Sequence, residues 1–556
     1  METSATPSVT SATPTTTSAT PATTAAAPSG RAVLDPLTRI EGHLRVECEV
    51  ENGKIVDAWV SDTLYRGMET ILVDRKPEDA YFVAQRICGV CPVSHGHAST
   101  MSTESAYGLT IPAGARLVRN IIEAAQYLHS HVLWFYTLTA LDYVDPVKAL
   151  SANIADTYAL AQKAGTRTAD FGAVATRLKT FVDNGQLSIF TNGWFGHPAY
   201  AQDMPPELHL IAVAHYLEAL QVQAEAAQVI AIMGGKFPHF MTSIPGGTAW
   251  VPTEEKLDDV LFRLTRINEW VTTAMIPDTL AIAPFYKDAL GYGGGVGNFL
   301  AWGVFTQEGG EANAEGQYDL NKRYMPGGVI MDKQLAVQDA DPTKVLEYVE
   351  HSWYSSPSAL NPADGQTKAD FTKFSNADKY SWGKAPRYDG KPMEVGPLSR
   401  MLIGYLKGVT PVKNIVDTAL GALGAAGKPE VLISLLGRVA ARNLETKVVA
   451  DWSLEWVQEL IEAIKGGEVS LFQSGEKDAG KGAGLWEAPR GAVGHWMTVD
   501  SGRISGYQVV TPSTWDTSPR DKDGVRGPME EALIGAPCID IEKPMEALRI
   551  AHSFDP

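Results

Sequence analysis

The sequence predicts a helix-rich α/β protein of several subdomains, with long central helices and a small antiparallel sheet near the N-terminus. The helices are predicted because apolar residues recur at three- and four-residue spacing over long stretches, such as residues 115–144. The sheet is predicted because apolar and charged residues alternate in residues 42–60 around the turn residues Asn52 and Gly53. The 556 residues, of which 44% are hydrophobic, exceed what one ordinary domain needs.

The first thirty residues differ from the rest of the chain. Residues 4–24 repeat Ser, Ala, Thr and Pro with a seven-residue period and contain no charged or aromatic residue. Such a segment cannot bury enough apolar surface to offset its conformational entropy, and it lacks the basic start and long apolar core of a secretory signal. We therefore expect residues 1–30 to be a disordered tail, with an unusual targeting segment as the alternative, and residues 31–556 to be folded.

Order is expected to begin near Ala32 and to continue into the hairpin of residues 42–60. Cys48 falls on the apolar face of this hairpin, so we expect a small core hydrophobe there rather than a metal ligand. Helical patterns recur along the rest of the chain, separated by glycine- and proline-rich connections such as residues 291–299. The predicted helices cover residues 115–144, 209–233, 255–274, 397–424 and 451–465.

The charge balance excludes some classes of partner. The formal net charge is −18 and the isoelectric point is near 5.2, so the chain repels phosphate backbones and offers no basic stripe to nucleic acid or anionic lipid. No run of 18 or more apolar residues is present, because Glu, Gln and His interrupt the most apolar helical stretch, residues 208–233. We expect no nucleic-acid partner and no transmembrane segment in the chain itself, so that any membrane association comes through partners.

Cys88 and Cys91 are the first residues with a chemistry of their own. Two cysteines three residues apart, with Gly89 between them, can direct both sulfurs at one metal, and thiolates suit nickel, zinc, iron or copper. A thioredoxin-like redox pair would open a helix after a strand in a small βαβ unit, which the flanking residues do not indicate. A structural zinc site needs four ligands, and the other two cysteines are isolated. A disulfide or an inert buried pair is the remaining alternative.

The surroundings of this pair favour one family. Seven segments, in the family's order and reaching from residue 37 to the last residue, resemble the large catalytic subunit of nickel–iron hydrogenases. The resemblance is closest to the uptake class, which works with an iron–sulfur partner subunit. The segments are "LTRIEGHLRVE" (37–47), "LYRGMETIL" (64–72), "QRICGVCPVSH" (85–95), "YSWGKAPRYDGKPMEVGPLSR" (380–400), "EAPRGAVGHW" (487–496), "YQVVTPSTW" (507–515) and "HSFDP" (552–556).

The resemblance implies the large-subunit hydrogenase fold and a catalytic region over residues 31–556. It also implies that dihydrogen is oxidised at nickel and at an iron that carries carbon monoxide and cyanide. Cys88 matches a terminal nickel ligand and Cys91 a ligand that bridges nickel and iron. The family supplies two further thiolates from a second CxxC, which is absent here, so the chain alone is expected to be inactive.

The family's second CxxC would begin directly after "HSFDP". In the nickel–iron–selenium branch this position is selenocysteine, encoded by UGA, which ordinary translation reads as stop. We therefore expect selenocysteine at position 557, with a truncated gene, or a split gene that encodes the last ligands separately, as alternatives.

Four further residues match the family's catalytic site, and three of them have a simpler local alternative. Heterolytic splitting of dihydrogen leaves a proton that needs an acceptor, and Glu41 matches the family's proton relay; its alternative is an ion pair with Arg39. Arg490 matches the arginine that contacts a cyanide, a role for its rigid guanidinium, and could otherwise be a surface residue in a turn. Ser513 matches the donor to the other cyanide, with a turn or helix cap as its alternative. Asp555 matches an acidic residue beside the arginine.

A magnesium-type site and two other positions also follow from the resemblance. Glu69 and the backbone carbonyl of Val509 match two hard oxygen ligands of a divalent cation. The third ligand, a histidine after the second CxxC, is not in the sequence. His95 matches a histidine that donates toward the bridging sulfur, with a core histidine as the alternative. Ser130 stands where most relatives have aspartate, which puts in doubt how the proton affinity of Arg490 is tuned.

The remaining expectations concern electrons and location. Four cysteines cannot hold a chain of iron–sulfur clusters, so we expect these clusters only in the partner subunit. The resemblance implies export to the periplasm with that partner, and a cytoplasmic location is the alternative. Two other functions stay open. A non-catalytic relative of the quinone-reductase type would lack the cysteine pair, and a dihydrogen-sensing regulatory protein would share the site but turn over slowly.

Overall fold

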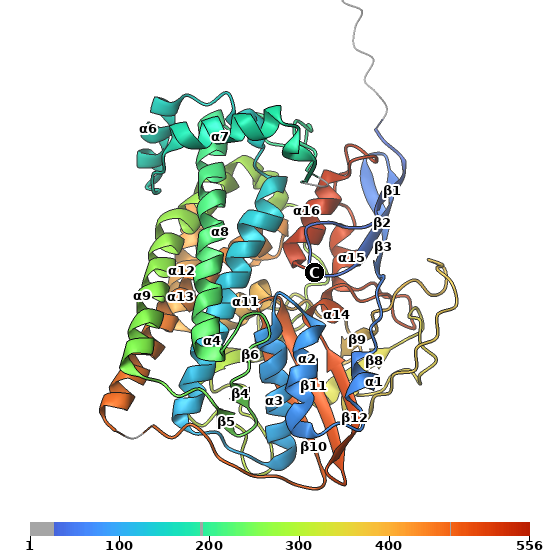
Figure 1. Ribbon diagram of the computed structural model, residues 1–556. Helices are drawn as coiled ribbons and strands as arrows, with labels where there is room; N and C mark the ends of the chain where they lie inside the picture. Colours follow the sequence, from blue (N-terminus) through green and yellow to red (C-terminus); the bar gives the residue numbers. More distant parts are fainter. Residues whose placement is uncertain (1–26, 190–192, 468) are drawn as a thin grey trace, which may run out of the picture.

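Four long helices form a bundle along one side of the molecule in the computed structural model, which describes residues 27–189, 193–467 and 469–556 (Figure 1). Helix α4 packs on α8 and α13, and α9 packs on the same two helices. Their facing sides bury a large apolar cluster, as the helical spacing of apolar residues predicts. The four helices are α4 (Ala113–Val132), α8 (Pro206–Gly234), α9 (Glu254–Trp270) and α13 (Leu435–Lys465).

Most of the predicted helices are confirmed. Residues 115–144, 209–233 and 255–274 correspond to α4, α8 and α9. The prediction of one helix over 397–424 is wrong, because the chain forms α11 (Pro397–Leu406) and α12 (Thr410–Ala422). Gly408 between them has a φ of 76°, a left-handed conformation that ends a helix and suits glycine.

Helix α13 begins at Leu435 rather than near residue 451. Its first half carries charged residues on the buried side, among them Arg438, Arg442 and Glu445, each no more than 4% exposed. Buried charges need paired partners and break the apolar period by which a helix is recognised in a sequence. This half of the helix therefore escaped prediction.

The predicted N-terminal hairpin is confirmed. Strands β1 (Gly30–Leu34), β2 (Leu44–Glu51) and β3 (Lys54–Asp62) form an antiparallel sheet in that order. The sheet begins at Gly30, two residues before Ala32, so the predicted tail of residues 1–30 is one residue too long; residues 1–26 lie outside the described part. Cys48 is 1% exposed and lies in the apolar cluster beneath the sheet, so its expected role as a core residue is confirmed.

A second antiparallel sheet supports the cysteine pair. Helix α3 lies across β10 and β11, and the approach is so close that a Cβ on Gly484 would meet the carbonyl oxygen of Ala98. Only glycine permits this contact between strand and helix backbone. The elements are α3 (Pro92–Tyr107), β10 (Gly480–Ala488), β11 (Gly491–Asp500) and β12 (Arg503–Val510).

The remaining elements are short and surround these layers. Five short helices and α10 are α1 (Met68–Leu72), α2 (Ala80–Ala84), α5 (Pro146–Ala149), α6 (Ile154–Ala164), α7 (Phe171–Asp183) and α10 (Ile276–Ile282). Near the C-terminus lie α14 (Pro512–Asp516), α15 (Pro528–Leu533) and α16 (Met545–Phe554). Three two-stranded antiparallel pairs are β4 (Ser243–Ile244) with β5 (Gly247–Thr248), β6 (Phe299–Thr306) with β7 (Arg323–Ile330), and β8 (Val345–Tyr348) with β9 (Ala385–Tyr388).

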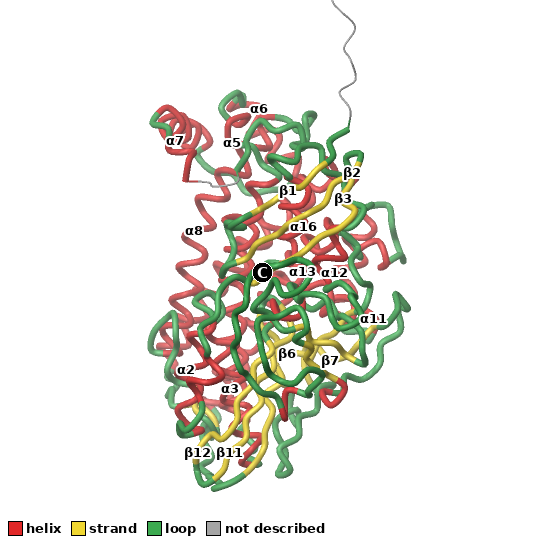
Figure 2. The backbone as a smooth tube through the Cα atoms, turned by 90° about the vertical axis from the view of Figure 1, so that its right-hand side faces the viewer, coloured by secondary structure: helices red, strands yellow, loops and turns green. Residues whose placement is uncertain are grey.

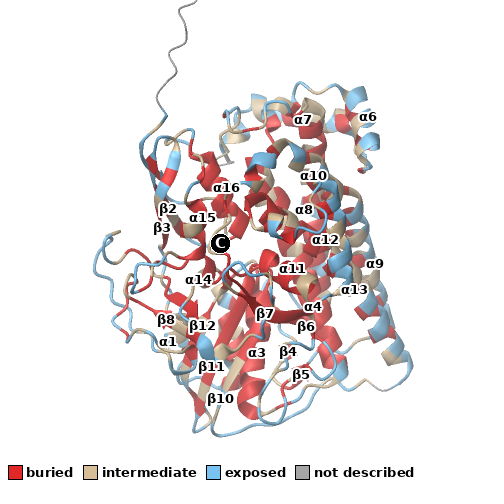
Figure 3. Cartoon of the chain, turned by 180° about the vertical axis from the view of Figure 1, so that it is seen from behind, coloured by how far each residue is buried: buried red, intermediate tan, exposed pale blue. Residues whose placement is uncertain are grey.

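The last described residues lie in the middle of the molecule. Pro556 is buried; the C-terminus lies between the N-terminal sheet and the helical bundle in Figure 1 and below that sheet in the tube view (Figure 2). Seen from behind, the segments around it are coloured as buried, whereas α9 turns an exposed face outward (Figure 3). The "HSFDP" segment is therefore buried along its whole length and is an interior element.

No helix in the described part of the chain has the length and apolar character needed to span a bilayer.

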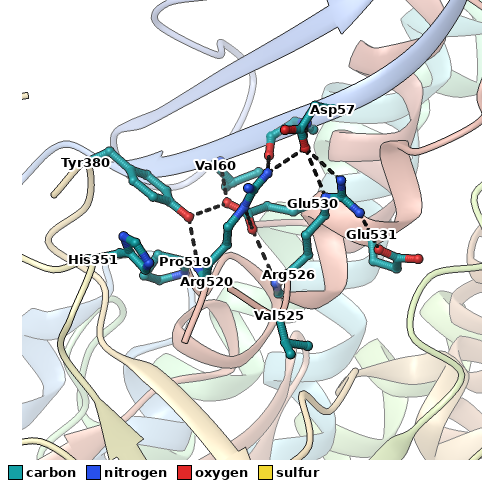
Figure 4. Close-up of polar contacts among 12 residues, drawn as sticks. Asp57, Val60, His351, Tyr380, Pro519, Arg520, Val525, Arg526, Glu530 and Glu531 are labelled. Atoms are coloured by element: carbon teal, nitrogen blue, oxygen red, sulfur yellow. Dashed lines mark hydrogen bonds and ion pairs between the residues drawn. The ribbon is translucent and has the colours of Figure 1, made fainter. Parts of the chain in front are cut away.

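Helix α15 is fastened to the N-terminal sheet by a buried carboxyl group. Glu530 Oε1 accepts hydrogen bonds from the backbone N–H of Val60 at 3.1 Å and from the Tyr380 hydroxyl at 2.8 Å. Arg520 and Arg526 bind Asp57 beside it (Figure 4). Burial raises the pKa of Glu530 to about 7, although these hydrogen bonds lower it.

A glutamine at position 530 should change how stability depends on pH. Because the folded state holds the Glu530 proton more tightly, its contribution to stability is complete below pH 4.5 and is lost as the pH rises through 7. We expect the melting temperature of the wild type to fall relative to Glu530→Gln between pH 5 and 8. The corresponding change in the free energy of unfolding of the wild type relative to the variant is about 3 kcal/mol. If the melting temperatures of both proteins change with pH in the same way across this range, the raised pKa of Glu530 is wrong.

Candidate metal centre

The Cys88–Cys91 turn is built so that both sulfurs are buried beside one another. Cys88 is extended, and Cys91 is the N-cap of α3, with Pro92 supplying the first helical position. The backbone N–H of Cys91 donates to the sulfur of Cys88 at 3.0 Å. The side chains are 6% and 3% exposed, so water has little access to either sulfur.

Electrostatics separate the two thiols. Burial by itself raises the pKa of Cys88, but a hydrogen bond from Cys91 and the charge of Arg490 bring it below the ordinary value. The pKa of Cys91 is raised, because its hydrogen bond to Cys88 and its burial both favour the protonated thiol. The two thiols therefore differ in acidity, and Cys88 is the one that loses its proton more readily when a soft metal ion binds.

Glu41 reaches this turn from the segment that leads into β2. Its Oε1 accepts a hydrogen bond from the backbone N–H of Gly89, between the two cysteines, at 3.2 Å. Arg39, the predicted ion-pair alternative, directs its guanidinium to Asp142 at 2.6 Å. The resemblance and the geometry therefore agree in placing Glu41 beside the cysteine pair.

Arg490 is a buried residue, 4% exposed, rather than a surface arginine in a turn. Its Nη1 donates to Ser130 Oγ at 3.1 Å, and its Nη2 lies 2.9 Å from Asp555 Oδ1. Asp555 Oδ2 lies 3.1 Å from Nη1 of Arg442. The contacts to Asp555 are ion pairs without hydrogen-bond alignment, so among the described residues Nε and Nη2 of Arg490 have no hydrogen-bond acceptor.

The buried guanidinium of Arg490 and the two buried thiols fit a soft metal ion with an anionic group beside it. A buried guanidinium with unused donors is costly unless an acceptor lies against it. The charge of Arg490 acts to lower the pKa of both Cys88 and Cys91. In the described part of the chain, no group of three or more His, Cys, Asp or Glu side chains could hold a metal ion.

A pocket of about 250 Å³ opens beside this site. Its walls include Glu41, Asp62, Ser513 and Pro556, which come from four separate segments. Ser513 lies in the first turn of α14, and Thr511 provides the N-cap by accepting from the backbone N–H of residue 514. The helix-cap role considered for Ser513 thus belongs to Thr511.

Glu69 and Val509 are also brought together, in a separate polar cluster. The backbone N–H of Val509 donates to Glu69 Oε1 at 2.9 Å. Lys384 Nζ lies 3.7 Å from Glu69 Oε2 and 3.2 Å from Glu347 Oε2. One lysine faces two carboxylates, and the second oxygen of Glu347 is buried without a hydrogen-bond partner among the described residues. Val509 contacts Glu69 through its N–H, whereas the resemblance matches its carbonyl oxygen to a cation ligand, so the cation site stays a prediction.

His95 heads a chain of buried polar groups behind the cysteine pair. Its Nδ1 lies 3.1 Å from Nε2 of His495, whose Nδ1 lies 2.7 Å from the Tyr507 hydroxyl, which donates to Ser99 at 2.8 Å. Burial lowers the pKa of His95 to about 3 and that of His495 well below its usual value, so both rings are neutral. The sequence indicated His95 but missed His495 and Tyr507, although both lie in segments quoted for the resemblance.

Residues of α13 and α11 that sequence reasoning missed hold Arg490 in place. Arg400 forms two hydrogen bonds to Glu445, at 2.6 and 2.7 Å, and donates to the carbonyl oxygen of Pro489 at 2.9 Å. Arg442 from the same region reaches Asp555. A buried ion pair of this geometry fixes orientation more than it adds stability. No local pattern marks these residues, because their partners are distant in sequence.

Comparisons with known proteins show the family of the chain. The family model described as nickel-dependent hydrogenase matches residues 66–556. The uptake hydrogenase large subunit of Rhizobium leguminosarum bv. viciae is 40% identical over 95% of this chain and 94% of its own length. The hydrogenase-2 large chain of Escherichia coli (strain K12) is 38% identical over 95% of this chain and 96% of its own length.

The fold is likewise similar to solved structures. The nickel–iron–selenium hydrogenase from Desulfovibrio vulgaris Hildenborough matches with a TM-score of 0.78 and 33% identity, over 95% of this chain and 98% of that one. The corresponding hydrogenase from Desulfomicrobium baculatum matches with a TM-score of 0.77 and 30% identity, over 95% and 99%. The chain therefore belongs to the nickel-dependent hydrogenase family and is a large subunit of that family.

Proposed function

We propose that this chain binds nickel and iron at Cys88 and Cys91 and there splits dihydrogen into protons and electrons. The observation that carries the proposal is the convergence of two buried sulfurs, the carboxylate of Glu41 and the guanidinium of Arg490 at one place. A thiolate pair supplies soft metal ligands. The carboxylate can carry a proton, and the guanidinium can donate hydrogen bonds to an anionic group. The family's nickel dependence supports the choice of metal.

The residues fit the expected groups as follows. Cys88 would be a terminal nickel ligand and Cys91 a ligand shared with iron, whose carbon monoxide and cyanide would lie against Arg490 and Ser513. The bound metals would supply the heterolytic cleavage of dihydrogen. Glu69 and Val509 would hold a magnesium-type cation in the neighbouring cluster.

The chain's own residues move the proton and keep the site dry. Glu41 receives the proton from the cysteine pair, because its carboxylate already contacts the backbone between the two cysteines. Arg490 stays charged, and its buried guanidinium would attract the anionic group. Burial of both sulfurs limits access of water, which strengthens these electrostatic effects.

Electrons would leave through a partner with iron–sulfur clusters. The four cysteines of the sequence are too few for such a chain of clusters, and exposed apolar side chains on either side of Glu69 offer a surface for a partner. Those side chains are Leu64, Ile71 and Val73. We propose an obligate interface here of about 2,000 Å² or more, and a periplasmic location shared with the partner.

Selenium belongs to the proposal as a further ligand. Solved structures with this fold are described as nickel–iron–selenium hydrogenases, and Pro556 lines the same pocket as Glu41 and Ser513. Selenocysteine after Pro556 stays a prediction, which mass spectrometry of the C-terminal peptide of the native protein tests.

The proposed activity is tested on the complex purified from its source organism. We expect nickel and iron by elemental analysis, a co-purifying iron–sulfur subunit, and dihydrogen-dependent reduction of an artificial acceptor. Dihydrogen binding with negligible turnover would instead indicate a sensor. A native complex without nickel would overturn the proposal.

A further inference from the structure

A buried aspartate joins the two segments that bring Glu41 and Asp555 to the site. Asp142 Oδ1 accepts from Nη2 of Arg39 at 2.6 Å, and Arg39 lies two residues before Glu41. Asp142 Oδ2 lies 2.6 Å from Nδ1 of His552, which lies three residues before Asp555. One fully buried carboxylate thus contacts two segments more than 500 residues apart in the sequence.

The contact between the two segments is closed by His552 itself. Its Nε2 lies 2.8 Å from the carbonyl oxygen of Thr38, so the ring spans from Asp142 to the segment that carries Glu41. The two ring nitrogens of His552 thus face two oxygens, one of Asp142 and one of Thr38. Two guanidiniums complete the surroundings: Arg39 on the side chain of Asp142, and Arg549 donating to its backbone carbonyl at 2.9 Å.

The same network continues to the arginines at the site. The carbonyl oxygen of His552 accepts from the indole N–H of Trp134 at 2.8 Å, and Arg442 stacks over that indole at 4.5 Å. Arg442 in turn contacts Asp555, which pairs with Arg490. A displacement of His552 would therefore reach both the proton carrier and the guanidinium.

We infer that Asp142 is a positioning residue that sets Glu41 relative to Asp555 and Arg490. The inference rests on the proposed function, since it assigns Asp142 to the geometry of that reaction. Asp142 touches no reacting atom and acts through Arg39 and His552. Burial alone would raise the pKa of Asp142, but the charges of these two residues lower it to about 2, so the group is a permanent anion between cations.

Asp142→Asn keeps the shape of the side chain, but its amide N–H meets a group that is itself a donor. It also leaves the neighbouring arginines without their counter-ion. In the assembled enzyme we expect Asp142→Asn to lower kcat by about 10–100-fold, the cost of a small misplacement of reacting groups, with the KM for dihydrogen and the metal content unchanged. Amide hydrogen exchange should become faster in residues 36–44 and 549–556 together. Asp142→Glu should restore part of kcat.

The matched control is Asp278, another buried aspartate that binds a histidine. It lies 2.8 Å from Nδ1 of His215 and accepts from the Tyr136 hydroxyl at 2.8 Å. Asp278→Asn removes the same type of pair from the helical bundle and should leave kcat per assembled enzyme unchanged. A milder variant, His552→Gln, removes one donor, and it should still speed exchange in both segments.

The outcomes separate this inference from the proposed function. Wild-type exchange rates in both segments of Asp142→Asn, or a kcat loss of equal size in Asp278→Asn, would overturn the positioning role. If the wild-type complex fails to oxidise dihydrogen, the proposed function is wrong, and the exchange measurements still decide whether Asp142 links the two segments.

Discussion

Serine at position 88 is expected to remove nickel from the enzyme and to abolish dihydrogen oxidation. A serine hydroxyl stays protonated and is a hard, weak donor, whereas Cys88 carries a soft sulfur whose pKa is lowered by Cys91 and Arg490. Loss of a residue that only orients a metal ligand costs about 10–100-fold, so loss of a ligand should exceed this. Elemental analysis and acceptor reduction by the assembled complex measure both effects.

Cys48→Ser is the matched control for this change. Cys48 is equally buried but lies in the core beneath the N-terminal sheet, with a strongly raised pKa caused chiefly by burial. A hydroxyl there costs about 1–3 kcal/mol of stability if it finds no partner. Nickel content and turnover per folded molecule should stay at the wild-type level. Full nickel occupancy in Cys88→Ser would show that the metal lies elsewhere.

Glu69→Gln would test the proposed cation site at Glu69 and Val509, with a smaller expected effect than Cys88→Ser. The amide removes one negative charge opposite Lys384 and keeps an oxygen that can accept from Val509. We expect magnesium content to fall while nickel content is retained, because the two sites are separate. Unchanged magnesium binding would leave this cluster as a lysine-centred ion-pair network.

Local patterns predicted the parts of the fold that depend on neighbouring residues. The hairpin around Asn52 and Gly53 and the burial of Cys48 follow from alternation, and α4 follows from helical spacing. The break at Gly408 was overlooked because the apolar spacing continues on both sides of it. A left-handed glycine interrupts the backbone without interrupting the pattern of side chains.

The residues of the candidate site also fall into those that the sequence indicates and those that it does not. The cysteine pair, Glu41 and Arg490 lie in segments that resemble a known family, so the sequence could indicate them. Asp142 and Glu445 could not be indicated, because their role arises only when helices distant in sequence meet. A buried charge looks like a surface charge in a sequence until its partner is known.

The charge state of Arg490 bears on which residue takes up the proton. Burial lowers its pKa, but Asp555 and both cysteines raise it above the usual arginine value. Ser130 is neutral, so Asp555 is the carboxylate that pairs directly with Arg490 among the described residues. A guanidinium that holds its proton this firmly cannot serve as the base at neutral pH. We therefore propose Glu41 as the proton carrier.

Glutamine at position 41 is expected to leave the metals in place and to stop proton transfer. The amide oxygen can still accept from the Gly89 N–H, so the turn around the cysteines keeps its shape. An amide cannot carry a proton, and loss of a positioned general base costs about 100- to 10,000-fold. Hydrogen–deuterium exchange between dihydrogen and water, together with acceptor reduction, measures this loss in the assembled enzyme.

Two controls make the Glu41 result specific. Glu49→Gln changes an exposed carboxylate on β2 and should leave exchange and turnover unchanged. Glu41→Asp keeps the carboxylate but shortens its reach, so it should retain more exchange activity than the glutamine variant. Because nickel and iron contents are expected to match the wild type, a loss of metal in Glu41→Gln would indicate a structural role. Wild-type exchange in that variant would mean that the proton leaves by another group.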